Sequence, residues 1–318
     1  MSGAPWGATA GGQRYEQLTK ALLLRGESVS FHCPWDRYPP SPYEPKTDEF
    51  DVWVVGFPFR NLHTYPFKAK IKIYDVCDYW EEGMVEGQSF RDECAEVIRW
   101  ANAFVVVSPF LAAHIHMQRK GAPVFIIPNG LRVDANFTLP PKTAQPTVAF
   151  WGSWYVGQEW WDYKAVAELA RYLSDKGIRF VIRGAGDRPF PATLPSYVDI
   201  QHAWWGIPMQ DVIASLTRPL VGLVPFKSGM YVSLAADPVK VYEYVALQGI
   251  VLITNNVSHV HHQRVIAGLG DTSKLLCTLI DEAIERAKNV GKPVYVPTFL
   301  DRALEYIRAV EVIERWLS

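Results

Sequence analysis

The sequence has few cysteines, and their spacing excludes two kinds of cysteine-based site. The 318 residues contain four of them, Cys33, Cys77, Cys94 and Cys277, which lie far apart and form no C-x-x-C pair. This spacing argues against a zinc site and against a disulfide framework. We therefore expect reduced cysteines in the core of a cytoplasmic protein.

Long apolar runs and an excess of one charge are also absent. No apolar run reaches the roughly 18 to 20 residues of a membrane-spanning helix, and the N-terminus lacks the basic-then-apolar pattern of a signal peptide. Lysine and arginine total 32 against 33 for aspartate and glutamate, so no overall field attracts nucleic acid or an anionic membrane. We expect no nucleic-acid partner, and any membrane contact would be local and peripheral.

The sequence also lacks the spacing of a metal site. It has no Asp-x-Asp motif, and its histidines are not set with a carboxylate as ligand clusters usually are. His114 and His116 are two residues apart, so they face opposite ways on a predicted short helix. The pair His261-His262 is predicted to lie in a surface turn. We therefore expect no metal.

Strand-like and helix-like segments alternate along the chain, which predicts an α/β fold with parallel, doubly wound sheets. In the first half, strands are predicted at 28–33, 51–57, 70–80, 104–108 and 124–128, and helices at 14–25, 88–101 and 109–119. In the second half, strands are predicted at 148–151, 179–183, 198–202, 220–225 and 250–254, and helices at 162–176, 209–215, 238–248 and 299–316. The proline-containing stretch 131–146 is the predicted linker. We expect domains at 1–145 and 146–300, followed by a last helix at 301–318.

The glycine-rich residues 1–13 look like a loop that leaves a strand, although almost no strand precedes them. We therefore expect the chain to begin inside or just after its first strand. The glycines would let backbone amides approach a ligand, and the alternative is a flexible terminus.

The stretch 237–254 predicts a helix that feeds a buried strand. Asp237 can cap the helix, Pro238 suits its first turn, and Gly249 ends it. The free amides of the helix N-terminus and Lys240 form a predicted anion site, and Glu243, one turn deeper, can accept hydrogen bonds from a pair of hydroxyls. A diphosphate joined to a ribose fits this arrangement. The alternative is a capped core helix with a solvated lysine and glutamate.

The run Pro238-x-Lys240-x-x-Glu243-Tyr244-x-Ala246-x-x-Gly249 resembles the donor-binding helix of bacterial GT-B glycosyltransferases. Other segments resemble motifs of the same fold, and they occur in the same order along the chain. They are 74–78, 105–108 and 126–130 on the acceptor side, and 150–153, 182–186, 204–206 and 222–227 on the donor side. The resemblance implies two Rossmann-like domains with parallel sheets that face a cleft. It also implies a C-terminal helix that packs back on the N-terminal domain.

The resemblance implies a metal-independent glycosyltransferase of the hexosyltransferase class. It would move a sugar from a nucleoside-diphosphate sugar, a co-substrate rather than a cofactor, to a hydroxyl of a saccharide or glycolipid in polysaccharide or glycoconjugate synthesis. Many retaining members carry a glutamate at the place of Ala235, so the stereochemical outcome is open. The alternatives are a sugar-nucleotide epimerase or hydrolase and a non-catalytic sugar-binding protein, because fold does not fix chemistry.

The resemblance also suggests roles for single residues. Asp78 is the predicted base, since many relatives carry a His-Asp pair where this chain has Cys77-Asp78. A carboxylate beside apolar Tyr79 and Trp80 would have a raised pKa, which suits proton transfer. A helix-capping role for Asp78, and Asp75 as the base, are the alternatives. The predicted residues of the donor site are Gly152, Ser153, Arg183, Trp205, Lys227, Lys240 and Glu243, with Lys240 also catalytic and Trp160-Trp161 facing a sugar.

Overall fold

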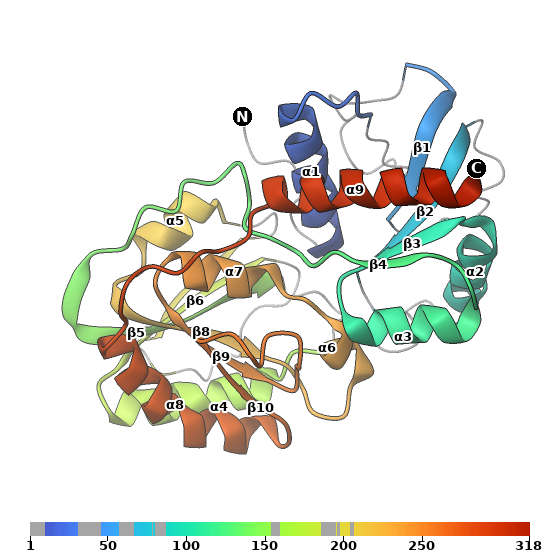
Figure 1. The fold of residues 1–318 in the computed structure, drawn as a ribbon. Coiled ribbons are helices and arrows are strands. Elements are labelled where there is room, and N and C mark those ends of the chain that lie inside the picture. The colour runs from blue at the N-terminus through green and yellow to red at the C-terminus, as the bar shows by residue number, and fades with distance from the viewer. Residues whose placement is uncertain are drawn as a thin grey trace. The chain divides into compact units, whose positions relative to one another are not determined.

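The computed structural model describes residues 10–30, 46–56, 67–77, 79, 87–153, 160–185, 195, 198–203 and 207–318. Figure 1 shows two parallel sheets with helices around each, which belong to two compact units. The β1–β4 unit comprises Thr9–Val133, Ala235–Asp237 and Pro297–Ser318. The β5–β10 unit comprises Asp134–Leu234 and Pro238–Val296.

The sheet of the β1–β4 unit has the strand order β1-β2-β3-β4, with every pair parallel. Its strands are β1 (Glu49–Val55), β2 (Lys68–Val76), β3 (Ala103–Val106) and β4 (Val124–Ile126). Helices α1 (Ala10–Leu24) and α9 (Phe299–Leu317) pack on each other and share one apolar core with Ile71, Ile73 and Val105. Helices α2 (Gly87–Trp100) and α3 (Pro109–Gln118) also pack on this sheet (Figure 1). The last helix of the chain is thus part of the same unit as the first.

The sheet of the β5–β10 unit has the order β10-β9-β8-β5-β6-β7, again all parallel. Its strands are β5 (Lys142–Ser153), β6 (Arg179–Ala185), β7 (Val198–Ala203), β8 (Arg218–Pro225), β9 (Ile250–Thr254) and β10 (Val265–Gly268). Helices α4 (Tyr163–Asp175) and α8 (Thr272–Lys288) pack together on the sheet, and α7 (Val239–Ala246) packs on β8 and β9. The short helices are α5 (Met209–Ala214) and α6 (Tyr231–Ala235). All five residues of β9 are buried, as expected for a strand covered on both faces.

Polar side chains mark where several helices begin. Asp162 accepts a hydrogen bond from the Ala165 amide at the start of α4, and Asp271 does the same for Lys274 in α8. Thr298 caps α9 in a capping box. Each cap satisfies an amide that the helix itself leaves unpaired.

The alternation of strands and helices is confirmed, while several boundaries differ from those predicted. Residues 28–30 form no strand, and the rest of the predicted strand 28–33 lies outside the described residues. Helix α1 begins at Ala10, inside the predicted glycine-rich loop, and β2 ends at Val76, before the predicted end at 80. Helices α6 and α8 and strand β10 were not predicted. Among the described residues, no helix combines the length and apolarity needed to cross a membrane.

Candidate functional site

Lys240, in the first turn of α7, lies against the carboxyl end of β5. Its Nζ atom is 3.9 Å from the ring centre of Trp161 and 5.3 Å from that of Phe150. A Cβ atom added at Gly152 would lie 2.6 Å from the same nitrogen, so a glycine is what lets the lysine approach the strand. The structure therefore brings together Lys240 and Gly152, two residues that the sequence assigns to one site.

The surroundings of Lys240 disfavour its positive charge. No carboxylate or carbonyl of the described residues pairs with Nζ, whose neighbours are aromatic rings. Burial lowers the pKa of Lys240 to about 7, and the charge of Glu243 acts in the opposite direction. A ligand that brings negative charge would restore the protonated form. The site is thus suited to an anion.

Glu243 lies one turn further along α7 and is buried. Its Oε2 accepts a hydrogen bond of 2.8 Å from the indole Nε1 of Trp151. Tyr244 anchors the same turn, because its hydroxyl donates to the Ala149 carbonyl at 3.1 Å, and its ring occupies the space that a Cβ at Gly222 would fill. Helix α7 is therefore fixed to β5 and β8. Sequence reasoning identified Glu243 and missed Trp151, whose contact depends on tertiary packing.

Trp161 forms the aromatic wall beside Lys240. Its ring stacks on Phe226 with centres 4.8 Å apart and planes 6° apart, and the two residues form an isolated β-bridge. The Trp161 Nε1 atom is buried without a hydrogen-bond partner among the described residues. Such an unsatisfied donor is costly, so an incoming acceptor atom would be favoured here. The predicted sugar-facing residue Trp161 is packed against Lys240 and Phe226, and its contact with a sugar stays a prediction.

The structure describes three of the other predicted donor residues: Arg183, Lys227 and Ser153. Arg183 is held by Asp199 on β7, with an ion pair of 3.0 Å and a hydrogen bond to its carbonyl. Lys227 is exposed, and its backbone amide donates to the Trp160 carbonyl. Ser153 is the last residue of β5 and adjoins Gly152. Asp78 and Trp205 lie outside the described residues.

The predicted capping role of Asp237 is wrong. The N-cap of α7 is Pro238, in an extended conformation and without a side-chain cap. The Asp237 carboxylate instead accepts a hydrogen bond from the backbone amide of Asn129, in the same β1–β4 unit. The Asp237 carboxylate therefore binds an amide that is distant in sequence, and not the amides at the start of α7.

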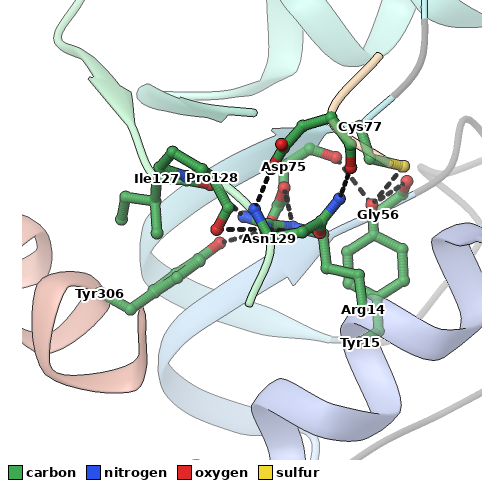
Figure 2. Close-up of polar contacts among 10 residues, drawn as sticks. Arg14, Tyr15, Gly56, Asp75, Cys77, Ile127, Pro128, Asn129 and Tyr306 are labelled. Atoms are coloured by element: carbon green, nitrogen blue, oxygen red, sulfur yellow. Dashed lines mark hydrogen bonds and ion pairs between the residues drawn. The ribbon is translucent and has the colours of Figure 1, made fainter. Parts of the chain in front are cut away.

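The β1–β4 unit contains a fully buried cation, Arg14 of α1. Figure 2 shows its guanidinium between Asp75 on β2 and the segment 127–129. The Nε atom is 3.0 Å from Asp75 Oδ1, while the Nη atoms donate to Asn129 Oδ1 at 3.1 Å and to the Ile127 carbonyl at 3.0 Å. Tyr306 of α9 donates to the other oxygen of Asp75 at 3.2 Å. The network joins three elements that are far apart in sequence.

Asp75, the alternative base, is fully buried in this network. Burial raises the pKa of Asp75, whereas the ion pair and hydrogen bonds with Arg14 lower it. The net result is a raised pKa of Asp75, while the guanidinium, which does not lose its proton, favours the ionised carboxylate beside it. With both carboxylate oxygens held by neighbours, Asp75 is better explained as a structural residue than as a base.

The histidines lie as the sequence indicates. His114 is buried in α3 and within 2.8 Å of the Gln118 amide nitrogen, while His116 on the same helix is exposed. His261 lies in a surface turn. In the part of the chain that the structure describes, no three His, Cys, Asp or Glu side chains are grouped so that they could hold a metal ion.

Comparisons with known proteins agree with this fold. No protein-family profile matches the chain, and no curated protein matches its sequence. Among solved structures, the chain is similar to the GtfA/B complex (TM-score 0.53, 10% identity, 83% of this chain and 57% of that one). It is also similar to a mutant of S. aureus TarM in complex with fondaparinux, α-GlcNAc-glycerol and UDP (TM-score 0.52, 14% identity, 84% of this chain and 54% of that one). The chain thus spans little more than half the length of these glycosyltransferases, and it shares with them the α/β fold of two parallel sheets that its GT-B motifs predict.

Proposed function

We propose that the chain is a glycosyltransferase that moves a sugar from a nucleoside-diphosphate sugar to an acceptor hydroxyl. The observation that carries this proposal is the position of Lys240, a half-buried cation without a carboxylate partner among the described residues, beside Gly152 at the end of β5. The carboxyl ends of parallel strands are where ligands bind in open α/β sheets. A diphosphate supplies the anion that Lys240 lacks.

The proposed chemistry needs stabilisation of the leaving nucleoside diphosphate. Negative charge grows on the diphosphate as the glycosidic bond breaks, and Lys240 would meet that charge in a setting lined by aromatic rings, where electrostatic interactions are stronger than in water. The backbone amides of Gly152 and Ser153 would add donors, and Glu243 would accept hydrogen bonds from the ribose. We assign the base to Asp78 from the sequence pattern, and we assign no step to a metal ion.

The complex of the similar TarM mutant contains UDP and two saccharides. We therefore choose UDP-sugars as the first donors to test and saccharides or glycolipids as acceptors, in keeping with a role in polysaccharide or glycoconjugate synthesis. Ala235, at the position where many retaining relatives carry a glutamate, is fully buried and cannot act as a nucleophile or base. The test must therefore determine the anomeric configuration of the product.

The test is a transfer assay with the full chain, a panel of nucleoside-diphosphate sugars and saccharide acceptors, with chelator present. We expect release of nucleoside diphosphate that depends on acceptor. Lys240→Ala should abolish most of it, while Lys164→Ala, which removes an exposed lysine of α4, should leave it unchanged. Release at the same rate without acceptor would instead identify a hydrolase, and activity that requires added magnesium would refute the metal-independent mechanism.

A further inference from the structure

A cationic pocket lies at the edge of the β5–β10 sheet opposite to Gly152 and Lys240. Ile250, one of its lining residues, is the first residue of β9, whereas Gly152 stands near the carboxyl end of β5. Because all strands of this sheet are parallel, the two places are on opposite edges. The pocket measures about 490 Å³, which is within the range of small-molecule sites. It belongs wholly to one compact unit.

Arg264 contributes a buried charge to this pocket. The residue is only 6% exposed, and its Nη2 donates to the Lys292 carbonyl at 2.7 Å and the Gly291 carbonyl at 3.4 Å. Its Nη1 is buried with no hydrogen-bond partner, and no carboxylate of the described residues pairs with it. Burial accordingly lowers the pKa of Arg264. Buried charges are normally paired, so the partner that is expected here is an anion.

Two further cations line the same pocket. Arg286, in the last turn of α8, is half-buried and donates from Nη2 to the Gln263 carbonyl at 2.7 Å, and Lys292 is exposed. The nearest acid that pairs with them is Glu282, whose carboxylate lies 3.7 Å from Arg286 Nη1 and outside the pocket lining. No acidic residue is among those that line the pocket, which include Gln263 and Asn289, and the Asn289 side-chain amide donates to the Glu285 carbonyl at 3.0 Å. Positive charge and donors thus exceed local negative charge.

The presence of cations in this pocket is only partly explained by their interaction with the carboxyl end of α8. A basic residue in the last turn of a helix is stabilised by the helix dipole, which accounts for Arg286. Arg264 comes from the segment before β10, and the carbonyls that it binds belong to residues beyond α8. Its unpaired Nη1 therefore needs a separate explanation.

We propose that this pocket binds a phosphate monoester. A dianionic, tetrahedral group presents enough acceptors for two guanidiniums and an ammonium, whereas a carboxylate has one charge and two oxygens. The site is independent of the proposed nucleotide site, because it shares no residue with it. A ligand here would bind the same unit from the other edge of the sheet.

The test uses the full chain with Lys240→Ala as the background, so that the other candidate anion site is weakened. Binding of radiolabelled inorganic phosphate is measured by equilibrium dialysis at low ionic strength. We expect the double change Arg286→Gln, Lys292→Gln to raise the Kd about tenfold or more, the range for loss of hydrogen bonds to a charged group. Lys142→Gln, at an exposed residue on the same edge of the sheet, should leave the Kd unchanged.

Two further arms identify the source of the phosphate. Glycerol 3-phosphate competes with inorganic phosphate if the ligand is soluble, and vesicles that contain phosphatidic acid bind the chain, with phosphatidylcholine vesicles as the control, if the ligand is a lipid headgroup. The proposal is supported if glycerol 3-phosphate competes or if the phosphatidic acid vesicles bind, provided that the double variant loses this binding. It is overturned if neither probe binds, if binding survives in the double variant, or if succinate binds as tightly as phosphate.

Discussion

Two cations in this protein, the buried Arg14 and the half-buried Lys240, have opposite surroundings. Arg14 in the β1–β4 unit has a carboxylate, a side-chain amide and backbone carbonyls around its guanidinium. Lys240 in the β5–β10 unit has aromatic rings around its ammonium and a glycine where another side chain would block it. The pKa of Arg14 is raised, with burial opposed by the Asp75 charge, while burial lowers the pKa of Lys240 to about 7.

The difference separates a structural charge from a binding charge. The groups that satisfy Arg14 are all supplied by the fold, so its network holds α1, β2 and α9 together. The fold supplies no such partner to Lys240 among the described residues, so its charge is best satisfied by something that binds. Substitutions should therefore affect stability at the first cation and function at the second.

The largest expected effect is on stability, at Asp75. Asp75→Asn keeps the shape of the side chain but leaves the buried Arg14 charge without a carboxylate, which should lower the free energy of unfolding by about 3 to 5 kcal/mol. Denaturant unfolding of the full chain measures this. Asp51→Asn is the matched control, because it breaks an exposed ion pair with Lys70 and should change little. Equal losses in the two variants would contradict the assignment of a structural role to the buried pair.

The next effect is on turnover, at Lys240. Lys240→Ala removes the group that meets the growing charge on the diphosphate, so it should raise the activation barrier by about 2 to 4 kcal/mol. It should not lower the free energy of unfolding as Asp75→Asn does, since an unpaired, partly desolvated charge is removed. Steady-state kinetics and denaturant unfolding of the same preparations test both parts. If Lys240→Ala lowers the free energy of unfolding and leaves turnover unchanged, Lys240 is a structural charge and not a binding charge.

A smaller effect is expected at Glu243 and its partner Trp151. Glu243→Gln removes a charged acceptor that is used before and during the reaction, so it should mainly weaken donor binding, by about 1.5 to 3 kcal/mol. Trp151→Phe removes only the indole N–H that holds this carboxylate and should act in the same direction with a smaller loss. Calorimetry with UDP and with 2′-deoxy-UDP tests whether Glu243 and Trp151 act through the ribose hydroxyls. If the ribose contact is correct, both variants discriminate less between the two nucleotides than the natural chain does.

The sequence predicted the parts of the site that depend on short spacing. Lys240 and Glu243 are three residues apart on one helix, and Gly152 is near the end of a buried strand, so their positions follow from helix and sheet geometry. The pairs Arg14–Asp75 and Trp151–Glu243 are 61 and 92 residues apart in sequence. Their meeting depends on strand register and helix packing, which no local pattern specifies.

Tertiary contacts also explain why the prediction that Asp237 caps α7 was wrong. Asp237 precedes a helix and looks like its cap, but the Asn129 amide, 108 residues away in sequence, takes its carboxylate. Arg183, a predicted donor-site residue, pairs with Asp199 on the neighbouring strand, and its role toward a ligand stays a prediction. At Asp237 a tertiary partner has replaced the one that the local sequence suggested.

The central claim is that Lys240 binds the diphosphate in its charged form, and the uptake of protons on binding tests it most directly. At pH 8, a lysine with a pKa of about 7 is mostly neutral in the free protein, and a bound diphosphate should return the proton to it. Calorimetric titration with UDP in buffers of different ionisation enthalpy should then show uptake of close to one proton per UDP in the natural chain. Lys240→Met should show none, and the affinity of the natural chain should fall as the pH rises from 6 to 9. Binding without proton uptake, or the same uptake in Lys240→Met, would contradict the claim.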